Sequence, residues 1–491
     1  AWLADQDLAW TLVEGAVTRV RELENELGCF FDRNPDGTLH QKAFAGQTFD
    51  RTVHKGDLTG IEIMNRLAEQ VWARDIGRLE EHRAVELIRS ATGDAIAGAL
   101  MIDVRSGEFV LVRARAVLLA TGGGPTMYRY HTPSGDKSCD GMAMALRAGL
   151  PLRDMEMVQF HPTGLLAGPD TRMTGTVLEE GLRGAGGHLL NGVHERFMQR
   201  YDERAERATR DVVSRAIATE IRAGRASPAG GVYLRMRHLG ADSVRRQFKG
   251  MVERCADCGF DLAQGDVEVV PTAHYMMGGV VFATDCTTAM PGLFAAGEDT
   301  GGVHGANRLG GNGVANSTVF GGIAGDAMAA WLRGRPARAD PDERAIASAL
   351  ARHQAPFARP AGGLAAIRER LHDCMWEDVG ILRTATGLER ARTTLNELDA
   401  ALDATGVDGA DRAFNLAWHD WLNLKSLVTV STAITHAALS RSDSRGAHFR
   451  EDHPGISALA TSTYTVVRLR ADALETSHLP VHFTRLAPAD A

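Results

Sequence analysis

Residues 297–313 combine many glycines with three side chains that can take part in chemistry, namely Glu298, His304 and Arg308. Glycines allow positive φ angles and a close approach of the backbone to a ligand. The stretch directly follows a short apolar run, 292–296, which is typical of a buried strand. The glycines alone would fit an ordinary surface loop. Charged side chains among them, directly after a strand, instead favour a site for a large anionic cofactor.

Two further features support a cofactor site. The small residues 316–325 predict a helix after the loop, and the free N–H groups at a helix start can face a pyrophosphate. A second apolar run ends in the Ala-Thr-Gly-Gly turn 120–123, where a strand end would bring bare backbone against the cofactor. On its own, this second motif fits an ordinary strand and glycine turn equally well.

Polar groups in the middle of the chain are candidates for acid–base chemistry. His161 stands before a proline, where a single histidine is more often a loop residue than a catalytic one. Arg210 begins a predicted helix, and Asp211 in its first turn complements the positive end of that helix. The segment 179–222 is strongly charged throughout, so a solvated charged face is the alternative interpretation.

The elements that must position these groups are helices and strands before residue 333 and almost entirely helices over residues 343–440. A Pro-, Arg- and Ala-rich stretch, 333–342, is typical of a linker, and helical periodicity fills 343–440. Predicted helices cover residues 8–27, 60–74, 142–148, 210–222, 364–376, 385–402 and 414–439, and predicted strands cover 95–104, 108–119 and 461–485.

The composition is that of a globular protein. With 491 residues the chain exceeds one ordinary core, so two or three domains are expected. A net charge of −8 argues against a nucleic-acid partner, and no apolar run reaches the ~20 residues needed to span a bilayer. The first residues are acidic and do not resemble a secretory signal. Six scattered cysteines suggest a reducing compartment and structural thiols, because Cys255 and Cys258 have no second pair nearby for a metal.

One feature of nucleotide-binding folds is missing near the start. A doubly wound fold of that kind should open with a strand and the fingerprint G-x-G-x-x-G. This chain opens with the predicted helix 8–27 and carries no such fingerprint there. Either the dinucleotide half-site is absent or the sequence is a fragment without its first βαβ unit, and the motifs that follow favour the fragment.

Six motifs occur along nearly the whole chain in one order. They lie at residues 120–123, 159–164, 210–213, 274–279, 293–325 and 444–452. This ordered set resembles the succinate dehydrogenase/fumarate reductase flavoprotein family, which also contains L-aspartate oxidase. No single motif carries the resemblance.

The resemblance implies an α/β, two-dinucleotide-binding flavoprotein fold lacking its first βαβ unit, with an α+β capping insert and a C-terminal helical domain. The family's covalent flavin-linking histidine belongs to the absent segment, so covalent attachment stays open. The implied divisions are 1–155 and 276–333 for the FAD-binding domain, 156–275 for the capping or substrate domain, 343–453 for the helical domain and 454–491 for tail strands.

The family's chemistry is dehydrogenation of a C–C bond flanked by carboxylates, or the reverse reduction, with hydride passing between a substrate carbon and flavin N5. The cofactor performs the hard step, and the protein supplies orientation and charge. By resemblance, Arg210 carries the proton. Because arginine is a poor acid–base group, it needs a relay, for which Glu180 and Arg183 stand in the matching positions.

The resemblance also implies contacts for substrate and cofactor. Arg308 suits a substrate carboxylate because its two N–H groups form a fixed fork, and His161 and His274 are further donors. No metal ligand is implied. The implied FAD contacts are Ala120, Thr121, Gly122, Gly123, Asp140, Glu298, Gly313 and Val314.

Two positions depart from the family pattern. Glu179 stands where relatives have a Thr or Ser that helps to hold a substrate carboxylate. An ionised Glu179 would repel that carboxylate unless it is protonated or turned away, which leaves the exact substrate open. Gly313 and Val314 replace a Ser-Leu pair, which affects only fine flavin contacts.

We therefore predict a FAD-dependent oxidoreductase that interconverts succinate and fumarate or a related carboxylic acid. An acid oxidase of the L-aspartate oxidase kind is the alternative. A third class is a flavin-binding electron-transfer or scaffold subunit. The presence of Arg210 with Glu180 and Arg183 argues against it, because an inert scaffold needs no acid–base relay. The resemblance implies an iron–sulfur subunit or other electron carrier as partner. It also implies a cytoplasmic location, free or peripheral at the membrane through partner subunits.

Overall fold

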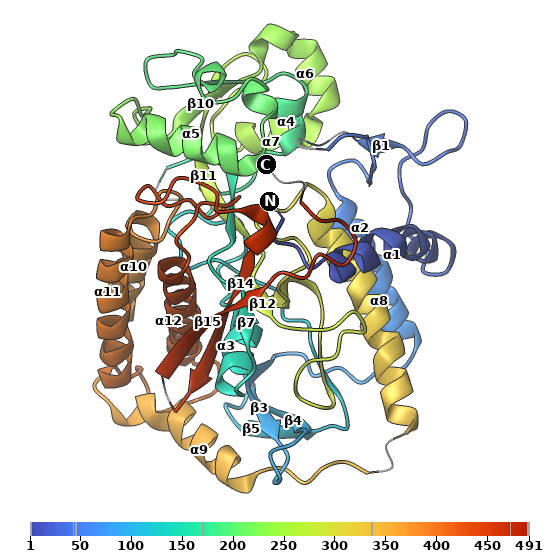
Figure 1. The fold of residues 1–491 in the computed structure, drawn as a ribbon, viewed down its shortest axis with the longest axis vertical. Helices are drawn as coiled ribbons and strands as arrows, with labels where there is room; N and C mark the ends of the chain where they lie inside the picture. The colour runs from blue at the N-terminus through green and yellow to red at the C-terminus, as the bar shows by residue number, and fades with distance from the viewer. Residues whose placement is uncertain are drawn as a thin grey trace.

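The computed structural model of this chain describes residues 2–42, 44, 47–168, 171–334, 337–471 and 473–488. Figure 1 shows an upper lobe standing on a larger body. The lobe, here called the capping lobe, is made from residues 158–276, and the other described residues form the body. The predicted α/β architecture with a capping insert and a C-terminal helical part is confirmed.

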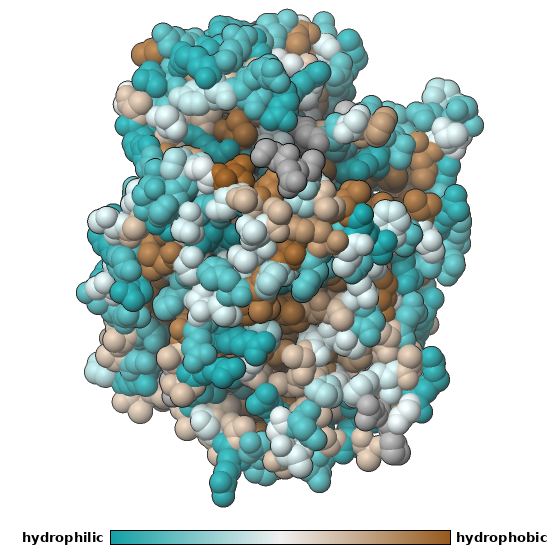
Figure 2. Space-filling model, in the orientation of Figure 1, coloured by the Kyte–Doolittle hydropathy of each residue, from teal (hydrophilic) through white to brown (hydrophobic). Residues whose placement is uncertain are grey.

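An antiparallel sheet in the order β8-β11-β10-β9 organises the capping lobe. Every position of β8 is buried, and Thr272 of β11 lies opposite His161 of β8. Figure 2 shows that the outside of the lobe is largely hydrophilic on this face, while hydrophobic side chains gather where it meets the body. The strands are β8 (Val158–Leu165), β9 (His188–Leu190), β10 (Val232–Arg235) and β11 (Asp266–Met276), and the helices are α4 (Glu180–Gly184), α5 (Arg210–Arg222), α6 (Ala241–Gln247) and α7 (Lys249–Ala256).

Two short parallel strands lie at the centre of the body. β6 (Val117–Leu119) pairs with β13 (Leu293–Ala295), with Leu119 opposite Ala295. Because parallel strands point the same way, the turn 120–123 and the loop 297–313 leave the sheet at the same edge. The two glycine-rich motifs of the sequence are therefore neighbours.

Helices and a small meander surround this centre. α1 (Gln6–Asn25) packs against α8 (Asn312–Arg333), while α3 (Asp140–Arg147) lies beside the meander. The meander is β3 (His82–Arg89), β4 (Ile96–Asp103) and β5 (Phe109–Arg113), and next to α1 lie β1 (Gln41–Lys42), β2 (Thr52–Val53) and α2 (Thr59–Ala73).

The end of the chain returns to the middle of the body. β14 (Thr463–Arg470) pairs with β7 (Leu152–Arg153) on one side and with β15 (Ala473–Pro480) on the other. β7 also pairs with β12 (Gly279–Val280), which gives the sheet order β12-β7-β14-β15. The predicted tail strands are thus part of a sheet with earlier segments of the chain.

Four helices between these parts form one side of the body in Figure 1. α12 packs against α11 and α3, so the helical part and the central body share one hydrophobic core. Trp418 and Trp421 of α12 are among the largest fully buried side chains. The helices are α9 (Glu343–Gln354), α10 (Leu364–Glu377), α11 (Ala385–Ala404) and α12 (Leu416–Ser440).

The prediction of one strand over 108–119 is wrong. The run is divided between β5, which is antiparallel to β4, and β6, which is parallel to β13 in another sheet. The apolar residues continue through the break, so a pattern of apolar positions does not reveal the change of partner. β3, the first strand of the meander, is not predicted by the sequence pattern either.

Candidate active site

The strand ends of β6 and β13 are held together by a buried carboxylate. Asp299 Oδ2 accepts hydrogen bonds from the backbone N–H groups of Thr121 and Gly122, the latter at 3.1 Å. The Thr121 hydroxyl donates to Asp299 Oδ1 at 2.9 Å. Burial raises the pKa of Asp299 to about 6. Asp299 therefore fixes the turn, while Ala120 and Thr121 remain exposed along it.

Glu298 is the second acid of this strand end. Its Oε1 accepts the N–H of Met276 at 2.8 Å, and burial raises the pKa of its carboxyl to about 7. A Cβ at Gly123 would overlap the same Oε1, so a larger residue there must displace the Glu298 side chain. Asp140 begins α3 nearby, and Arg83 donates to both of its carboxylate oxygens at 3.1 Å.

The start of α8 borders the same region. Gly313 and Val314 lie in its first turn, where backbone N–H groups have no acceptor within the helix. A Cβ at Gly313 would lie 3.0 Å from the Tyr275 ring and 3.2 Å from Arg308 Nη1. Val314 is exposed. The structure thus brings the predicted cofactor residues to one strand edge and one helix start.

The three relay residues form one buried chain. Arg210 Nη2 donates to Glu180 Oε2 at 2.8 Å, and Arg183 Nη2 donates to Glu180 Oε1 at 3.1 Å. All three side chains are buried. Burial alone would raise the pKa of Glu180, but the two guanidinium groups outweigh it and hold that pKa below its usual value. Glu180 is therefore an ionised bridge between two cations.

Two histidines face each other beside this chain. His161 on β8 and His274 on β11 have ring centroids 5.4 Å apart, and His161 is buried while His274 is half-buried. Burial, reinforced by the nearby Arg210, holds the pKa of each imidazole well below its usual value, so both rings are neutral. Thr163 N–H donates to His161 Nδ1 at 3.3 Å, which leaves the ring proton on Nε2.

Arg308 completes the cluster. Its guanidinium lies 4.4 Å from the centre of the Tyr275 ring, and its Nε is buried without a hydrogen-bond partner. Burial, with Arg210 as the next cause, lowers the pKa of Arg308 to about 10. A buried cation with an unused donor is suited to bind an anion such as a carboxylate.

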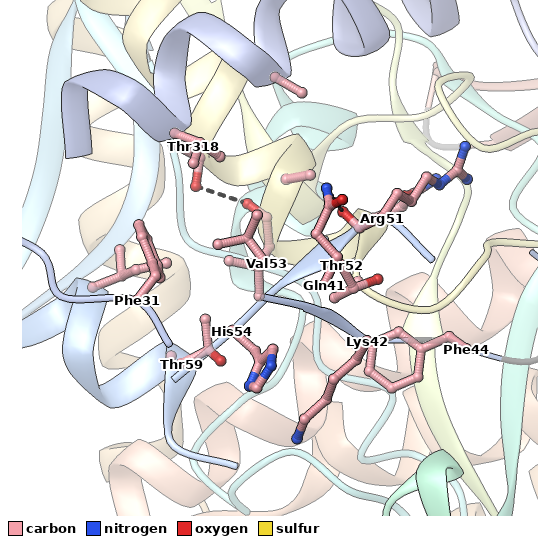
Figure 3. A pocket seen from close by; sticks show the side chains of 18 of the residues that line it. Phe31, Gln41, Lys42, Phe44, Arg51, Thr52, Val53, His54, Thr59 and Thr318 are labelled. Carbon is pink, nitrogen blue, oxygen red and sulfur yellow. Dashed lines mark hydrogen bonds between the residues drawn. The ribbon is translucent and has the colours of Figure 1, made fainter. Parts of the chain in front are cut away.

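Glu179 faces different surroundings from those of this cluster. It precedes α4 and lines a cavity of about 560 Å³ between α1, α8 and the β1–β2 segment, as does Val314. Figure 3 shows side chains around this cavity, among them Lys42 and His54. Burial raises the pKa of Glu179, opposed by Lys42 and reinforced by Asp57.

Sequence reasoning does not identify several residues that hold the site together. Gln159, an amide in the buried strand β8, accepts from Arg210 Nη1 at 3.0 Å and donates to the Arg308 carbonyl at 2.7 Å. Its place in the 159–164 motif, two residues before His161, is the signal that points to it. Asp299 lies next to Glu298 and has no comparable signal.

The described residue ranges contain neither a metal-binding cluster nor a membrane-spanning helix. Within them no cluster of three or more His, Cys, Asp or Glu side chains is placed to hold a metal ion. None of the helices in the same ranges is both long enough and apolar enough to cross a membrane. The six cysteines are free thiols.

Comparisons with known proteins give concordant results. The family model described as "FAD binding domain" matches residues 1–314, and "Fumarate reductase flavoprotein C-term" matches 368–491. A fumarate reductase (CoM/CoB) subunit from Methanothermobacter marburgensis is 40% identical over 92% of this chain and 81% of that protein. The fumarate reductase flavoprotein subunit of Escherichia coli is 34% identical over 92% of this chain and 77% of its own length.

Solved structures agree over the whole chain. A mutant of E. coli quinol fumarate reductase FrdA superposes with a TM-score of 0.93 at 33% identity, covering 100% of this chain and 86% of that one. Mycobacterium smegmatis Sdh1 in complex with UQ1 gives a TM-score of 0.85 at 36% identity, covering 98% and 82%.

Proposed function

This chain belongs to the succinate dehydrogenase/fumarate reductase flavoprotein family, and from that premise we propose how its residues carry out the FAD-dependent interconversion of succinate and fumarate. The observation that carries the proposal is the buried chain of Arg210, Glu180 and Arg183 beside the neutral pair His161 and His274. It offers acid–base and anion-binding groups within one cluster.

FAD fits the groups at the strand edge. Ala120 and Thr121 supply exposed backbone, with the half-buried Gly122 and the buried Gly123 following them in the turn. Glu298 and Asp140 supply carboxylates for hydroxyl groups, and the first turn of α8 at Gly313 and Val314 supplies free N–H groups. The Glu298 carboxyl lies directly against Gly123, so any side chain at 123 would displace this acid from the proposed cofactor edge. When bound, FAD supplies the ring that accepts or donates the hydride.

The substrate carboxylates are bound by Arg308, His161 and His274 in this proposal. The unpartnered Nε of Arg308 is a donor that a carboxylate can satisfy. The histidines, neutral because of their lowered pKa values, each offer one N–H without adding a competing charge. Three donors from β8, β11 and the loop before α8 would hold both ends of a C4 dicarboxylate.

Arg210 donates the proton on fumarate reduction and takes it back on succinate oxidation. On fumarate reduction, a proton would pass from Arg183 to the ionised Glu180 and from Glu180 Oε2, at 2.8 Å, to Arg210, and on succinate oxidation it would pass the opposite way. A guanidinium transfers a proton at a useful rate only when a neighbour replaces it at once. The contact of both arginines with one carboxylate meets that requirement.

Glu179 bears on the choice of substrate. If it is ionised, it disfavours a second carboxylate near its position and favours a neutral or cationic substituent. Its raised pKa and its place on the wall of the neighbouring cavity reduce that conflict for succinate and fumarate. We propose that Glu179 tunes the affinity for the substrate and does not take part in the chemistry.

We also propose that an iron–sulfur subunit or another electron carrier exchanges electrons with the flavin and holds this chain at the cytoplasmic side of a membrane. The structural relatives named above are described with a quinol or with UQ1, which supports a chain of carriers in them. The domain divisions proposed for this chain are 1–155 with 276–333, 156–275, 343–453 and 454–491.

A comparison of oxidants for the reduced flavin tests the function. The protein is loaded with FAD, reduced with dithionite without oxygen, and mixed with fumarate or with oxygenated buffer. Fumarate is expected to restore the absorbance of oxidised flavin faster than oxygen does. Oxidation by oxygen alone would favour an acid oxidase. A reduced flavin that neither fumarate nor oxygen reoxidises would favour an electron-transfer scaffold. A preparation of the full-length protein that remains colourless after incubation with FAD and removal of the excess would contradict the proposal altogether.

A further inference from the structure

Arg210 and Arg308 must act on the same substrate but come from different parts of the fold. Arg210 begins α5 in the capping lobe, and Arg308 lies in the loop before α8 in the body. Two guanidinium groups repel each other, so their spacing must be fixed by other groups. The structure contains a set of hydrogen bonds that joins these two segments.

The central bond of this set links the residues next to the two arginines. Asn307 Nδ2 donates to Asp211 Oδ1 at 2.7 Å. Asn307 is the neighbour of Arg308, and Asp211 is the neighbour of Arg210. One side-chain contact between lobe and body therefore connects the backbone of both arginines.

A second amide closes the connection on the substrate side. Gln159 Nε2 donates to Asn307 Oδ1 at 2.9 Å and to the Arg308 carbonyl at 2.7 Å, and its Oε1 accepts from Arg210 Nη1 at 3.0 Å. Asp211 is held in turn by the Thr209 hydroxyl at 2.6 Å and by Arg215 at 3.2 Å. Every polar atom of the Asn307 and Gln159 amide groups that faces this junction is thus oriented by a partner.

We infer that Asp211 and Asn307 are positioning residues, which set the distance between the proton-carrying Arg210 and the substrate-binding Arg308 through the hydrogen bond between them. This inference rests on the proposed roles of the two arginines. Loss of the hydrogen bond leaves the segments that carry Arg210 and Arg308 intact and changes only the distance between the two arginines. Breaking this bond is therefore expected to lower kcat more than it affects KM or flavin binding.

The test exchanges the two partners. Asn307→Asp sets two carboxylates against each other, and kcat for fumarate reduction is expected to fall by about 10- to 100-fold, as for a reacting group displaced by about an ångström. In the double variant Asn307→Asp with Asp211→Asn, the new amide at 211 donates to the new carboxylate at 307, and most of the lost kcat is expected to return. KM and the visible spectrum of bound flavin are measured for each variant.

Three controls decide between outcomes. Arg222→Gln breaks another contact between α5 and the body, the exposed pair with Glu451, and is expected to leave kcat unchanged. Asp211→Asn alone retains an acceptor for Asn307 and is expected to keep most activity even if Asn307→Asp does not fold, whereas a large loss would overturn the inference. Arg210→Lys, assayed in parallel, distinguishes failure of the positioning role from failure of the proposed function. Full activity of Arg210→Lys would refute the proposed function itself.

Wild-type kcat in Asn307→Asp, or an exchange variant that binds FAD but recovers no activity, would overturn the positioning role. A combined loss of flavin and of thermal stability in Asn307→Asp, with no recovery in the exchange variant, would also overturn it, because that pattern belongs to a bond needed only for folding.

Discussion

At the scale of single residues, the site contains one acid that the fold keeps ionised and two acids that the fold makes easier to protonate. Glu180 lies between Arg210 and Arg183, which hold its pKa below the usual value. Asp299 is buried and Glu298 half-buried, neither forms an ion pair like those of Glu180, and their pKa values rise to about 6 and about 7. The same side-chain type thus serves as a charged proton acceptor in one place and as a hydrogen-bonding group in another.

Replacing Arg210 by lysine is expected to lower turnover by at least ~100-fold while flavin stays bound, because lysine lacks the planar fork and misplaces the proton by more than an ångström. Stopped-flow oxidation of the reduced flavin by fumarate measures the rate, and the visible spectrum reports the flavin. Arg204→Lys is the matched control, since Arg204 is exposed and pairs only with Asp202 among the contacts described. A near wild-type rate in Arg210→Lys would remove Arg210 from the mechanism.

Replacing Glu179 by threonine is expected to lower KM for succinate at neutral pH by on the order of tenfold, equivalent to about 1.4 kcal/mol of lost repulsion. The gain should shrink as the pH falls, because protonation of Glu179, favoured by its raised pKa, removes the same repulsion in the wild type. Steady-state assays of both variants over a range of pH give the comparison, with the exposed Glu253→Thr as control. Weaker succinate binding in Glu179→Thr would show that this carboxyl helps to hold the substrate.

The raised pKa of Glu298 predicts how the cofactor-free protein responds to pH. Its folded pKa of about 7 exceeds the unfolded value of 4.5, so the folded state binds the proton more tightly. The resulting stability is fully present below pH 4.5 and is lost as the pH rises through about 7, and it amounts to roughly 3 kcal/mol at most. Thermal unfolding of apoprotein should therefore show a smaller decline between pH 5 and 8 in Glu298→Gln than in wild type. Equal declines would mean that Glu298 is ionised throughout this range.

At the scale of elements, the turn after β6 and the start of α8 meet because β6 and β13 are parallel. Neither element is long, so side-chain contacts decide where the turn lies. Gly123 is the tightest of these positions, since the Glu298 carboxyl occupies the space that a side chain would need.

Gly123→Ala is expected to weaken FAD binding by at least about tenfold, which corresponds to ~1.4 kcal/mol, because the added methyl group displaces Glu298. Quenching of flavin fluorescence during titration of the apoprotein measures the affinity. Gly321→Ala within α8 is the control, because no atom lies within 4 Å of the added Cβ, and alanine favours a helix. Unchanged affinity in Gly123→Ala would show that the Glu298 side chain can move aside without cost.

The sequence predicts those elements whose own residues mark their limits. α5 begins at Arg210 and ends at Arg222 as predicted, and Gly149 ends α3 with a φ of +83°. Sequence patterns fail at 108–119, where the chain changes sheets without a break in its apolar residues.

The candidate site shows the same limit. The motifs contain Gln159 and Asn307 as well as Arg210 and Arg308, but they do not reveal that the two amides connect the two arginines. Those amides contact each other only after the capping lobe has packed on the body, and no spacing along the chain encodes that contact. α2 illustrates a second limit, because Ile61, Met64 and Leu67, apolar residues at helical spacing that would be expected to face a core, are exposed in the structure.

At the scale of the whole molecule, the last strands support the cofactor region from a distance along the chain. β14 pairs with β7, β7 pairs with β12, and Val280 of β12 forms a bridge to Thr300 in the glycine-rich loop. The C-terminal hairpin therefore stabilises the loop that carries Glu298 and Arg308.

Val467→Asp is expected to abolish the soluble flavin-binding form of the protein. Val467 is fully buried in β14 opposite Leu152, and burying an unpaired carboxylate costs several kcal/mol. Arg468→Asp, the next residue on the exposed face, is expected to fold and bind FAD normally. Soluble yield and the ratio of flavin to protein distinguish the two. A soluble, yellow Val467→Asp protein would show that the hairpin is dispensable for the cofactor site.

The pairing of β14 with β7 also has a consequence for biosynthesis. A ribosome adds roughly 5–20 residues per second, so Leu152 and Arg153 leave the exit tunnel long before their partners Val466 and Val467 exist. Throughout that interval one edge of β7 has no partner strand, and the glycine-rich loop lacks its final support. The fully supported loop therefore cannot exist until β14 has been synthesised and has paired with β7.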